Sequence, residues 1–337
     1  MKIIIDGMGG DNAPEAICEG AVLAARGIDH EIVLVGDEET LRKCVSKYQG
    51  RRPIDNISFV NAGESITNDD APAMAIRRKK DSSIVIGMNM LKNGEGDVFI
   101  SAGSTGALLA GGLLIVGRIK GIDRPAICSI YPILGGMASM LCDAGANSEC
   151  KPRNLVEFAL MSSIYMENVL GRENPSVALV NIGEEKGKGN SLTKEAYDLL
   201  MNSDLNFKGN IEARDVPKGK ADVIVTDGFT GNIILKLTEG MAWNIFKTIK
   251  NKFTDGLHAR VGSLFLVDKL MELKKEFDYA EYGGAPILGI NKPVVKMHGS
   301  SGAKGVKSTI MKAIDFVEED VINVIRESIQ VVRGIND

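Results

Sequence analysis

The sequence contains few aromatic and histidine residues, and this scarcity limits the kinds of site that it can build. Phenylalanine, tryptophan and tyrosine make up 5% of the 337 residues, and there is one tryptophan. A platform that stacks bases or sugars needs several aromatic faces, so we exclude that kind of site. The three histidines are too few and too scattered for a histidine metal cluster, and we expect no metal ion: His30, His258 and His298.

An excess of positive charge is also lacking. The chain has 40 lysines and arginines against 44 aspartates and glutamates, which gives a formal net charge of −4. Nucleic acid is held largely through a broad basic surface, so we expect no nucleic-acid partner. A partner that carries phosphate must instead be bound by a local arrangement of donors.

The cysteines indicate neither a disulfide framework nor a zinc site, because their number is odd and they show no short paired spacing. This usage is typical of a reducing compartment. The apolar run at the N-terminus ends at Asp6, which is too early for a signal peptide, so we expect a cytoplasmic location. The five cysteines are Cys18, Cys44, Cys128, Cys142 and Cys150.

Two uncharged runs are long enough to compare with a membrane-spanning helix, Val98–Gly117 with 20 residues and Pro125–Cys142 with 18. Glycines and serines interrupt both runs, and the second also contains two prolines. Buried strand–loop–helix segments of an α/β sheet have the same uncharged character. We therefore interpret both runs as parts of a sheet and not as membrane spans.

Apolar runs of strand length alternate with helical patterns along the chain, and no linker rich in proline or serine divides it. This alternation predicts an α/β protein with three layers, α/β/α, around a large, mixed and mostly parallel sheet, in a single domain over residues 1–337. The predicted strands are Lys2–Asp6, Glu31–Val35, Ile57–Asn61, Asp97–Ser101, Ala126–Tyr131, Met137–Cys142, Val177–Asn181 and Val223–Thr226. The predicted helices are one capped by Asn12 and ending near Arg26, then Glu38–Tyr48, Ala71–Arg78, Ile84–Asn93, Thr105–Arg118, Asn154–Leu170, Leu192–Met201, Gly231–Phe253 and Ile310–Arg333.

Residues 253–278 or so are expected to form a protruding amphipathic helical segment. Leu266, Leu270, Leu273 and Phe277 recur at helical spacing, and lysines and glutamates occupy the opposite side. Two interpretations stay open for this apolar face. It packs at a subunit interface, or it contacts a bilayer surface reversibly.

Glycine is abundant, with 38 residues, and many glycines occur in loops that follow predicted strands. Ligands of open α/β sheets bind where such loops lead into helices, because free backbone N–H groups attract anions there. The first loop places Gly9 and Gly10 between Asp6 and Asp11, without the spacing of a dinucleotide fingerprint. We expect the two aspartates to orient this loop, and an ordinary tight turn is the alternative.

The second loop, Ser101–Ala107, is a stronger candidate for an anion site. The hydroxyls of Ser104 and Thr105 stand between Gly103 and Gly106, after a buried strand and before a helix. Hydroxyls beside unobstructed backbone amides would suit phosphate or an oxyanion. The alternative is an ordinary helix cap.

Two later loops add polar groups. Lys188 lies between glycines in the third loop, from where it could bring a charge to phosphate, although this is no P-loop and a solvated lysine is the alternative. In the fourth loop Asp227 and Asn232 bracket a turn, and Asn232 could donate to a substrate oxygen. Helix capping by Thr230 is the alternative there.

The stretch His298–Gly305 also offers hydroxyls, a histidine and a lysine. His298 and Ser301 are candidates for binding phosphate or moving a proton, although a single histidine is more often structural. The chain has no Gly-x-Ser-x-Gly elbow and no cysteine in a context that lowers its pKa. The predicted chemistry is therefore transfer by positioning, without a covalent nucleophile.

Six motifs occur in order along the chain: DGMGGDNAP from Asp6, SAGSTGA from Ser101, LCDAGAN from Leu141, NIG from Asn181, DGFTGN from Asp227 and YGGA from Tyr282. Together they closely resemble the bacterial phosphate acyltransferase family, over essentially the whole chain. The resemblance implies reversible transfer of a long-chain acyl group from acyl carrier protein to inorganic phosphate. Phosphate would attack the thioester directly, with no covalent enzyme intermediate and no cofactor.

The resemblance also implies a biological setting. The acyl phosphate would supply a membrane glycerol-3-phosphate acyltransferase in phospholipid synthesis. The family is similar in fold to isocitrate and isopropylmalate dehydrogenases and to phosphotransacetylases. Its members are typically homodimers, cytoplasmic and peripherally associated with the membrane.

Under this resemblance the loop residues take roles. Ser104, Thr105 and Lys188 would hold phosphate, Asn232 would donate to the carbonyl oxygen, and Asp227 would orient its loop or accept a proton. The leucines of the amphipathic segment would contact the acyl chain or the bilayer. An acidic carrier protein would need a basic patch, for which the candidates are Lys247, Lys250, Lys252 and Arg260.

Three rival functions remain. A short-chain acyl-CoA phosphotransferase would share the fold and the anion loops, and a comparison of acyl donors would separate it. A decarboxylating dehydrogenase would bind a nicotinamide cofactor and need a cluster of metal-binding aspartates. A non-catalytic adaptor for carrier protein or lipid would not bind phosphate.

Overall fold

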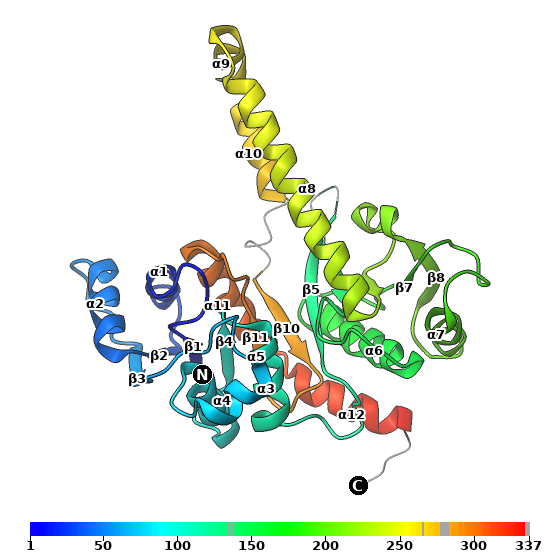
Figure 1. Cartoon of the computed structure of the whole chain (residues 1–337), viewed down its shortest axis with the longest axis horizontal. Coiled ribbons are helices and arrows are strands. Elements are labelled where there is room, and N and C mark those ends of the chain that lie inside the picture. The colour runs from blue at the N-terminus through cyan, green and yellow to red at the C-terminus, as the bar shows by residue number, and fades with distance from the viewer. Residues whose placement is uncertain (134, 136–137, 265, 277–282, 334–337) are drawn as a thin grey trace.

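A computed structural model describes residues 1–333 apart from 134, 136–137, 265 and 277–282. Eleven strands form one continuous sheet in the order β3-β2-β1-β4-β11-β10-β5-β6-β9-β7-β8 (Figure 1). The strands are β1 Lys2–Asp6, β2 Glu31–Gly36, β3 Ile57–Asn61, β4 Val98–Ser101, β5 Ala126–Pro132, β6 Ala138–Cys142, β7 Val177–Asn181, β8 Phe207–Glu212, β9 Val223–Val225, β10 Ala285–Leu288 and β11 Val294–Lys296.

Helices cover both faces of this sheet. They are α1 Glu15–Ala25, α2 Glu38–Gln49, α3 Pro72–Arg78, α4 Ser83–Asn93, α5 Thr105–Gly111, α6 Pro152–Asn168, α7 Ser191–Met201, α8 Gly228–Thr254, α9 Leu257–Leu264, α10 Val267–Glu276, α11 Ala303–Glu318 and α12 Val321–Arg333. A π-helical turn, Gly112–Val116, extends α5, and a 3₁₀ turn, Ala213–Lys218, follows β8.

Alternate side chains of each strand face opposite layers, which explains why the strands are so apolar. In β1, Ile3 and Ile5 pack into the cluster under α1, α2, α6, α7, α11 and α12, whereas Ile4 packs under α3, α4 and α5. On that second face, the other half of the sheet is covered by a smaller cluster that includes Ile234 of α8. The predicted three-layer α/β/α class is therefore confirmed.

The two halves of the sheet run in opposite directions. Seven neighbouring pairs are parallel, and the three antiparallel pairs, β11–β10, β10–β5 and β5–β6, adjoin one another at the centre. The carboxyl ends of β1 and β4 consequently point the opposite way from those of β6, β7 and β9. The four glycine-rich loops do not share one end of the sheet, as a uniformly parallel sheet would require.

Most predicted elements are confirmed, and the differences have local causes. The predicted helix over 310–333 is two helices, because the chain turns at Asp320, whose φ is 47°. The helical segment predicted over about 253–278 contains two helices, α9 and α10, after the end of α8, and Phe277 lies outside the described residues. Sequence patterns missed the short strands β10 and β11 and the half-buried β8, whose existence depends on pairing with distant strands.

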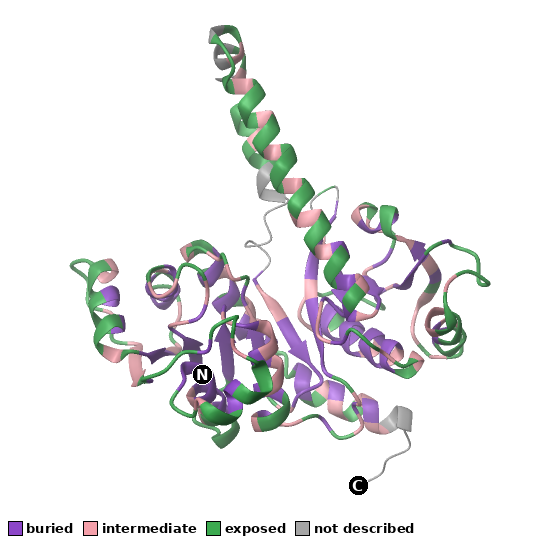
Figure 2. Cartoon of the chain, viewed as in Figure 1, coloured by how far each residue is buried: buried purple, intermediate pink, exposed green. Residues whose placement is uncertain are grey.

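Helices α8, α9 and α10 form a hairpin that projects from the body (Figure 1). Among the hairpin residues whose exposure the structure describes, only Gly228, Gly231 and Ile234, in the first two turns of α8, are buried, and the others are exposed or half-buried (Figure 2). Within the described part of the chain, no helix is both long and apolar enough to cross a membrane. The assignment of residues 1–337 to a single domain remains a prediction.

Candidate active site

A cavity of about 810 Å³ lies between the two halves of the molecule. One wall consists of the loops after β1, β4 and β11, and the facing wall consists of the loop after β6 and one side of α8. Central strands β5 and β10 contribute Ile127, Ser129 and Ala285. The cavity thus collects chain segments from residue 8 to residue 309.

The buried carboxylate of Asp6 joins the first two glycine loops. It accepts hydrogen bonds from the Ser101 hydroxyl (2.6 Å) and the Met8 amide (3.1 Å), and the Ser101 hydroxyl in turn accepts one from the Gly103 amide (2.9 Å). A Cβ on Gly9 would lie 2.3 Å from Asp6 Oδ2 and 2.7 Å from the Gly103 nitrogen, so this close approach requires glycine. Burial raises the pKa of Asp6, and these hydrogen bonds oppose the rise.

The continuation of the first loop is tied to the loop after β11. The Asp11 amide donates to the Gly299 carbonyl oxygen at 2.8 Å, and the Asn12 side-chain amide donates to the Ser300 carbonyl oxygen at 3.0 Å. The expectation that Asn12 caps the first helix is therefore wrong, because its side chain serves this loop contact and Pro14 is the N-cap. Asp11, Gly10, His298 and Ser301 all line the cavity.

The second loop, which follows β4, carries the residues that the sequence analysis predicts to bind an anion. Ser104 is the N-cap residue of α5, and its hydroxyl makes no capping hydrogen bond. Gly103, Ser104, Thr105 and Gly106 all line the cavity.

A lysine that the sequence analysis missed lies against this loop. Lys296 ends β11, lines the cavity, and its ammonium donates to the carbonyl oxygens of Ala102 (3.1 Å) and Met297. Burial, together with the charge of Lys236, lowers the pKa of Lys296 to about 8. Lys296 becomes a site residue because β11 pairs with β4, the strand that leads into the Ser101 loop.

The facing wall is one side of α8. Asn232, Leu235, Lys236 and Glu239 follow each other at helical spacing and line the cavity. Lys236 pairs with Glu239 at 3.0 Å, and the Glu239 carboxylate lies 3.6 Å from Nε2 of His298. Its Nδ1 lies 2.8 Å from the Ser300 hydroxyl, in the loop after β11. His298 therefore contacts both walls of the cavity.

Asp143, from the motif at Leu141, organises the start of that wall. Its buried carboxylate accepts hydrogen bonds from the amides of Ile127, Gly145, Ala146 and Asn147 and from the Asn147 side chain, at 2.7–3.2 Å. The turn so formed places Ala144, Gly145 and Ala146 on the cavity. Burial raises the pKa of Asp143 despite these donors.

Two predicted residues do not reach this cavity. Asp227 caps α8: its carboxylate accepts hydrogen bonds from the Thr230 amide (2.9 Å) and hydroxyl (2.8 Å), which supports a loop-orienting role, and Asp227 is not among the described residues that line the cavity. Lys188 is an exposed residue of the loop after β7. It is not among the described residues that line the cavity. In the strand order β7 lies beyond β6 and β9, farther from the central strands that the cavity adjoins, and this position accounts for the separation.

The cavity thus combines cations, hydroxyls and backbone donors, which suits a phosphate and a polarised carbonyl group. Among the described residues, no three histidines, cysteines, aspartates or glutamates gather as a metal site would require. The nearby thiol of Cys150 is not activated as a nucleophile, because burial raises its pKa to about 12.

Comparison with known proteins identifies the family. A family model described as "Fatty acid synthesis protein" matches residues 1–324. The chain is 51% identical to a protein of Alkaliphilus oremlandii and 50% identical to one of Clostridioides difficile, both named "Phosphate acyltransferase", over 98% of this chain and 97% and 96% of theirs. The chain belongs to the phosphate acyltransferase family. It is an enzyme that transfers an acyl group to phosphate.

Solved structures agree on the fold. A phosphotransacetylase from Streptococcus pyogenes superimposes with a TM-score of 0.64 at 18% identity, covering 95% of this chain and 94% of that one. A branched-chain phosphotransacylase from Enterococcus faecalis gives 0.58 at 15% identity, covering 94% and 99%. At these identities the likeness concerns the fold alone.

Replacing Gly231 by alanine should damage the enzyme through the Asp143 turn. A Cβ at Gly231 would lie 1.9 Å from the backbone carbonyl oxygen of Asp143. This oxygen belongs to the backbone, so it cannot move aside as the end of a flexible side chain could. We expect a loss of roughly 2–4 kcal/mol of stability in urea denaturation, together with reduced turnover because Asn232 moves.

Gly240→Ala on the same helix is the matched control, because a Cβ there meets no atom within 4 Å. This variant should keep its activity and gain roughly 0.5–1 kcal/mol from better helix propensity. Equal stability of the two variants would contradict the close packing of α8 on Asp143.

Proposed function

We propose that the enzyme transfers a long-chain acyl group from acyl carrier protein to inorganic phosphate, reversibly, and that the acyl phosphate serves phospholipid synthesis. The observation that carries the proposal is one cavity that is lined both by Lys296 and Lys236 and by Ser104 and Thr105. The names of the relatives that share half of its residues support phosphate as the acceptor.

In the proposed mechanism, phosphate rests on the Ser104–Thr105 loop with Lys296 beneath it. A phosphate oxygen attacks the thioester carbon, and Asn232 donates to the carbonyl oxygen as negative charge develops there. The carbon–sulfur bond then breaks, and the proton of the attacking hydrogen phosphate passes to the leaving thiolate. A thioester is already activated, so the enzyme needs to orient the two substrates and stabilise the oxyanion.

The lysines offset the aspartates of the first loop. Asp6 and Asp11 both act electrostatically on Lys296, and without a cation their charges would repel phosphate. We propose that Asp6 and Asp11, with Gly9 and Gly10, maintain the loop geometry. His298, held between Glu239 and Ser300, is the candidate for passing the proton, with Ser301 beside it.

The hairpin is proposed to join two copies of the chain and to contact the bilayer. On α8, Ile233, Leu237, Met241 and Ile245 recur every four residues, and each is at least half exposed. Leu266 and Leu273 are exposed toward the far end of the hairpin, with Leu270 half-buried, and are the candidates for contact with lipid or an acyl chain. Lys247, Lys250 and Lys252 remain candidates for receiving the acidic carrier protein, whereas the side chain of Arg260 lies outside the described residues.

The test of the proposed function is loss of thioester from palmitoyl–acyl carrier protein, with acyl phosphate trapped by hydroxylamine. We expect turnover that requires phosphate and that is much slower with palmitoyl-CoA. Efficient use of short-chain acyl-CoA would favour the acyl-CoA phosphotransferase. Absence of turnover with every donor, by a folded protein, would favour a non-catalytic adaptor.

Lys296→Gln should raise the KM for phosphate at least tenfold, because a charge-assisted hydrogen bond to the anion is lost. In the wild type, kcat/KM for phosphate should fall as the pH rises through about 8, since Lys296 then loses its proton; the variant should lack this limb. Lys188→Ala is the parallel test. A raised phosphate KM in Lys188→Ala with none in Lys296→Gln would overturn the assignment to Lys296.

The double variant L237E/M241E should convert a dimer to a monomer in sedimentation velocity, because four-residue spacing places both carboxylates on the exposed apolar face. Lys250→Glu changes the net charge by the same amount on the opposite side of α8 and should remain dimeric. A double variant that stays dimeric but no longer floats with anionic vesicles would assign this face to the membrane instead.

A further inference from the structure

A second cavity, of about 660 Å³, adjoins the one described above. It lies between the loop before β5 and the loop that follows the Asp143 turn. Leu109 and Ala146 line both cavities, so the two spaces share a wall of one helix residue and one turn residue. A ligand long enough to pass these two side chains would occupy both.

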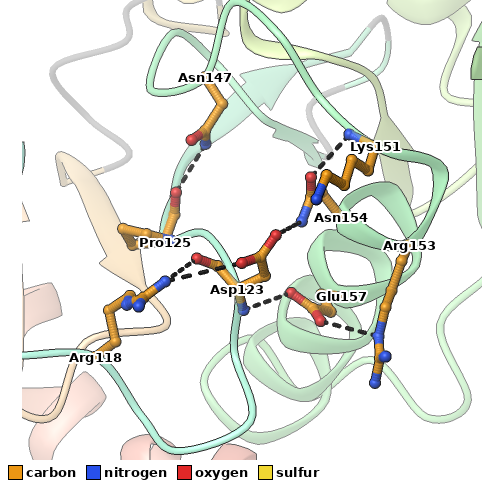
Figure 3. A network of polar contacts seen from close by, with 8 residues as sticks. All are labelled: Arg118, Asp123, Pro125, Asn147, Lys151, Arg153, Asn154 and Glu157. Atoms are coloured by element: carbon orange, nitrogen blue, oxygen red, sulfur yellow. Dashed lines mark hydrogen bonds and ion pairs between the residues drawn. The ribbon is translucent and has the colours of Figure 1, made fainter.

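The framework of this cavity is held by polar contacts around Asp123 (Figure 3). The Asp123 amide donates to the buried Glu157 carboxylate at 2.9 Å, and the Asn154 side chain donates to the Asp123 carboxylate at 3.1 Å. The Arg118 guanidinium donates to the Asp123 carbonyl oxygen. Nearby, the Asn147 side chain donates to the Pro125 carbonyl oxygen at 2.8 Å, which ties this loop to the Asp143 turn.

Cations outnumber anions in the lining. The lining contains three cationic residues, Arg118, Arg124 and Lys151, and two anionic residues, Asp123 and Glu149. Asn154 holds the pKa of Asp123 below its usual range, with additional lowering by the three cations, so that carboxyl is charged and already committed to the framework.

Two of those cations are available to a ligand. The side chains of Arg124 and Lys151 are exposed. The backbone amide of Lys151 donates to Asn154, but within the described ranges neither the Arg124 guanidinium nor the Lys151 ammonium forms an ion pair, and both act on Asp123 only electrostatically. The same cavity also has an apolar side, formed by Leu109 and Leu113. A ligand matched to this lining carries an anion at one end and a less polar chain that leads to the main cavity.

We propose that the second cavity binds the phosphate group on the arm that carries the acyl thioester, with Arg124 and Lys151 as its ligands. The inference rests on the proposed function, because it takes the thioester to lie in the main cavity. In a carrier protein or coenzyme thioester, a flexible amide-containing chain separates the sulfur from its first phosphate. That chain would pass Leu109 and Ala146 while the phosphate reaches the two cations.

The experiment compares two donors that differ only in this phosphate, S-palmitoyl-4′-phosphopantetheine and S-palmitoyl-pantetheine. The wild type should prefer the phosphorylated donor by about tenfold or more in kcat/KM, as expected for charge-assisted hydrogen bonds. Arg124→Gln and Lys151→Gln should each reduce this preference several-fold, and the double variant should abolish it. The KM for inorganic phosphate and the rate with palmitoyl-pantetheine should stay unchanged.

Arg52→Gln and Lys194→Gln are matched controls, because both remove an exposed charge that lines neither cavity. A thermal midpoint equal to that of the wild type would confirm that each variant is folded. An unchanged donor preference in the Arg124 and Lys151 variants would overturn the proposal. A raised KM for inorganic phosphate instead would assign the cavity to free phosphate.

Failure of the proposed function has a different signature. In that case the wild type itself shows no phosphate-dependent turnover with either donor or with palmitoyl–acyl carrier protein. Turnover by the wild type without discrimination between the two donors would leave the proposed function intact and reject the second cavity as the phosphate subsite.

Discussion

The site depends on the reversal of strand direction at the centre of the sheet. Three successive antiparallel pairs, β11–β10, β10–β5 and β5–β6, join two halves whose strands run in opposite directions. Loops from the carboxyl ends of β1 and β4 can therefore face α8, which rises from the other half, across a shared cavity. In a uniformly parallel sheet these loops would lie side by side, without an opposing wall.

Buried carboxylates give both walls their shape. Asp6 collects donors from two loops of one half, and Asp143 collects five donors in the other. Burying a charge costs several kcal/mol unless hydrogen bonds compensate for it, so each carboxylate is stable only while its loops keep their conformation. Glycines complete the arrangement where loops touch, as Gly9 does beside Asp6 and Gly231 beside Asp143. These aspartates are thus suited to positioning substrate-facing groups rather than to contacting phosphate.

Charge in the cavity is arranged to accept an anion despite a net charge of −4 for the chain. The Lys296 ammonium donates to backbone carbonyl oxygens and, among the described residues, forms no ion pair with a carboxylate, although Asp6 and Asp11 act on it electrostatically. In the neighbouring cavity Arg124 and Lys151 act electrostatically on Asp123, but among the described residues neither forms an ion pair with a carboxylate. Local placement of a few cations therefore matters more here than overall composition.

The sequence by itself determined the class of fold, the family and the glycine loops, because these follow from local patterns: apolar runs of strand length, helical periodicity and ordered motifs. It identified Ser104, Thr105, Asn232 and His298 as site candidates, and all four line one cavity. It could not show that Lys188 lies apart, because the place of β7 in the strand order depends on pairings across the whole sheet. Lys296 was missed for the same reason. Only the tertiary structure decided which loops face each other, since strand pairing and loop contacts join distant residues, such as Asn12 and Ser300, which lie 288 positions apart.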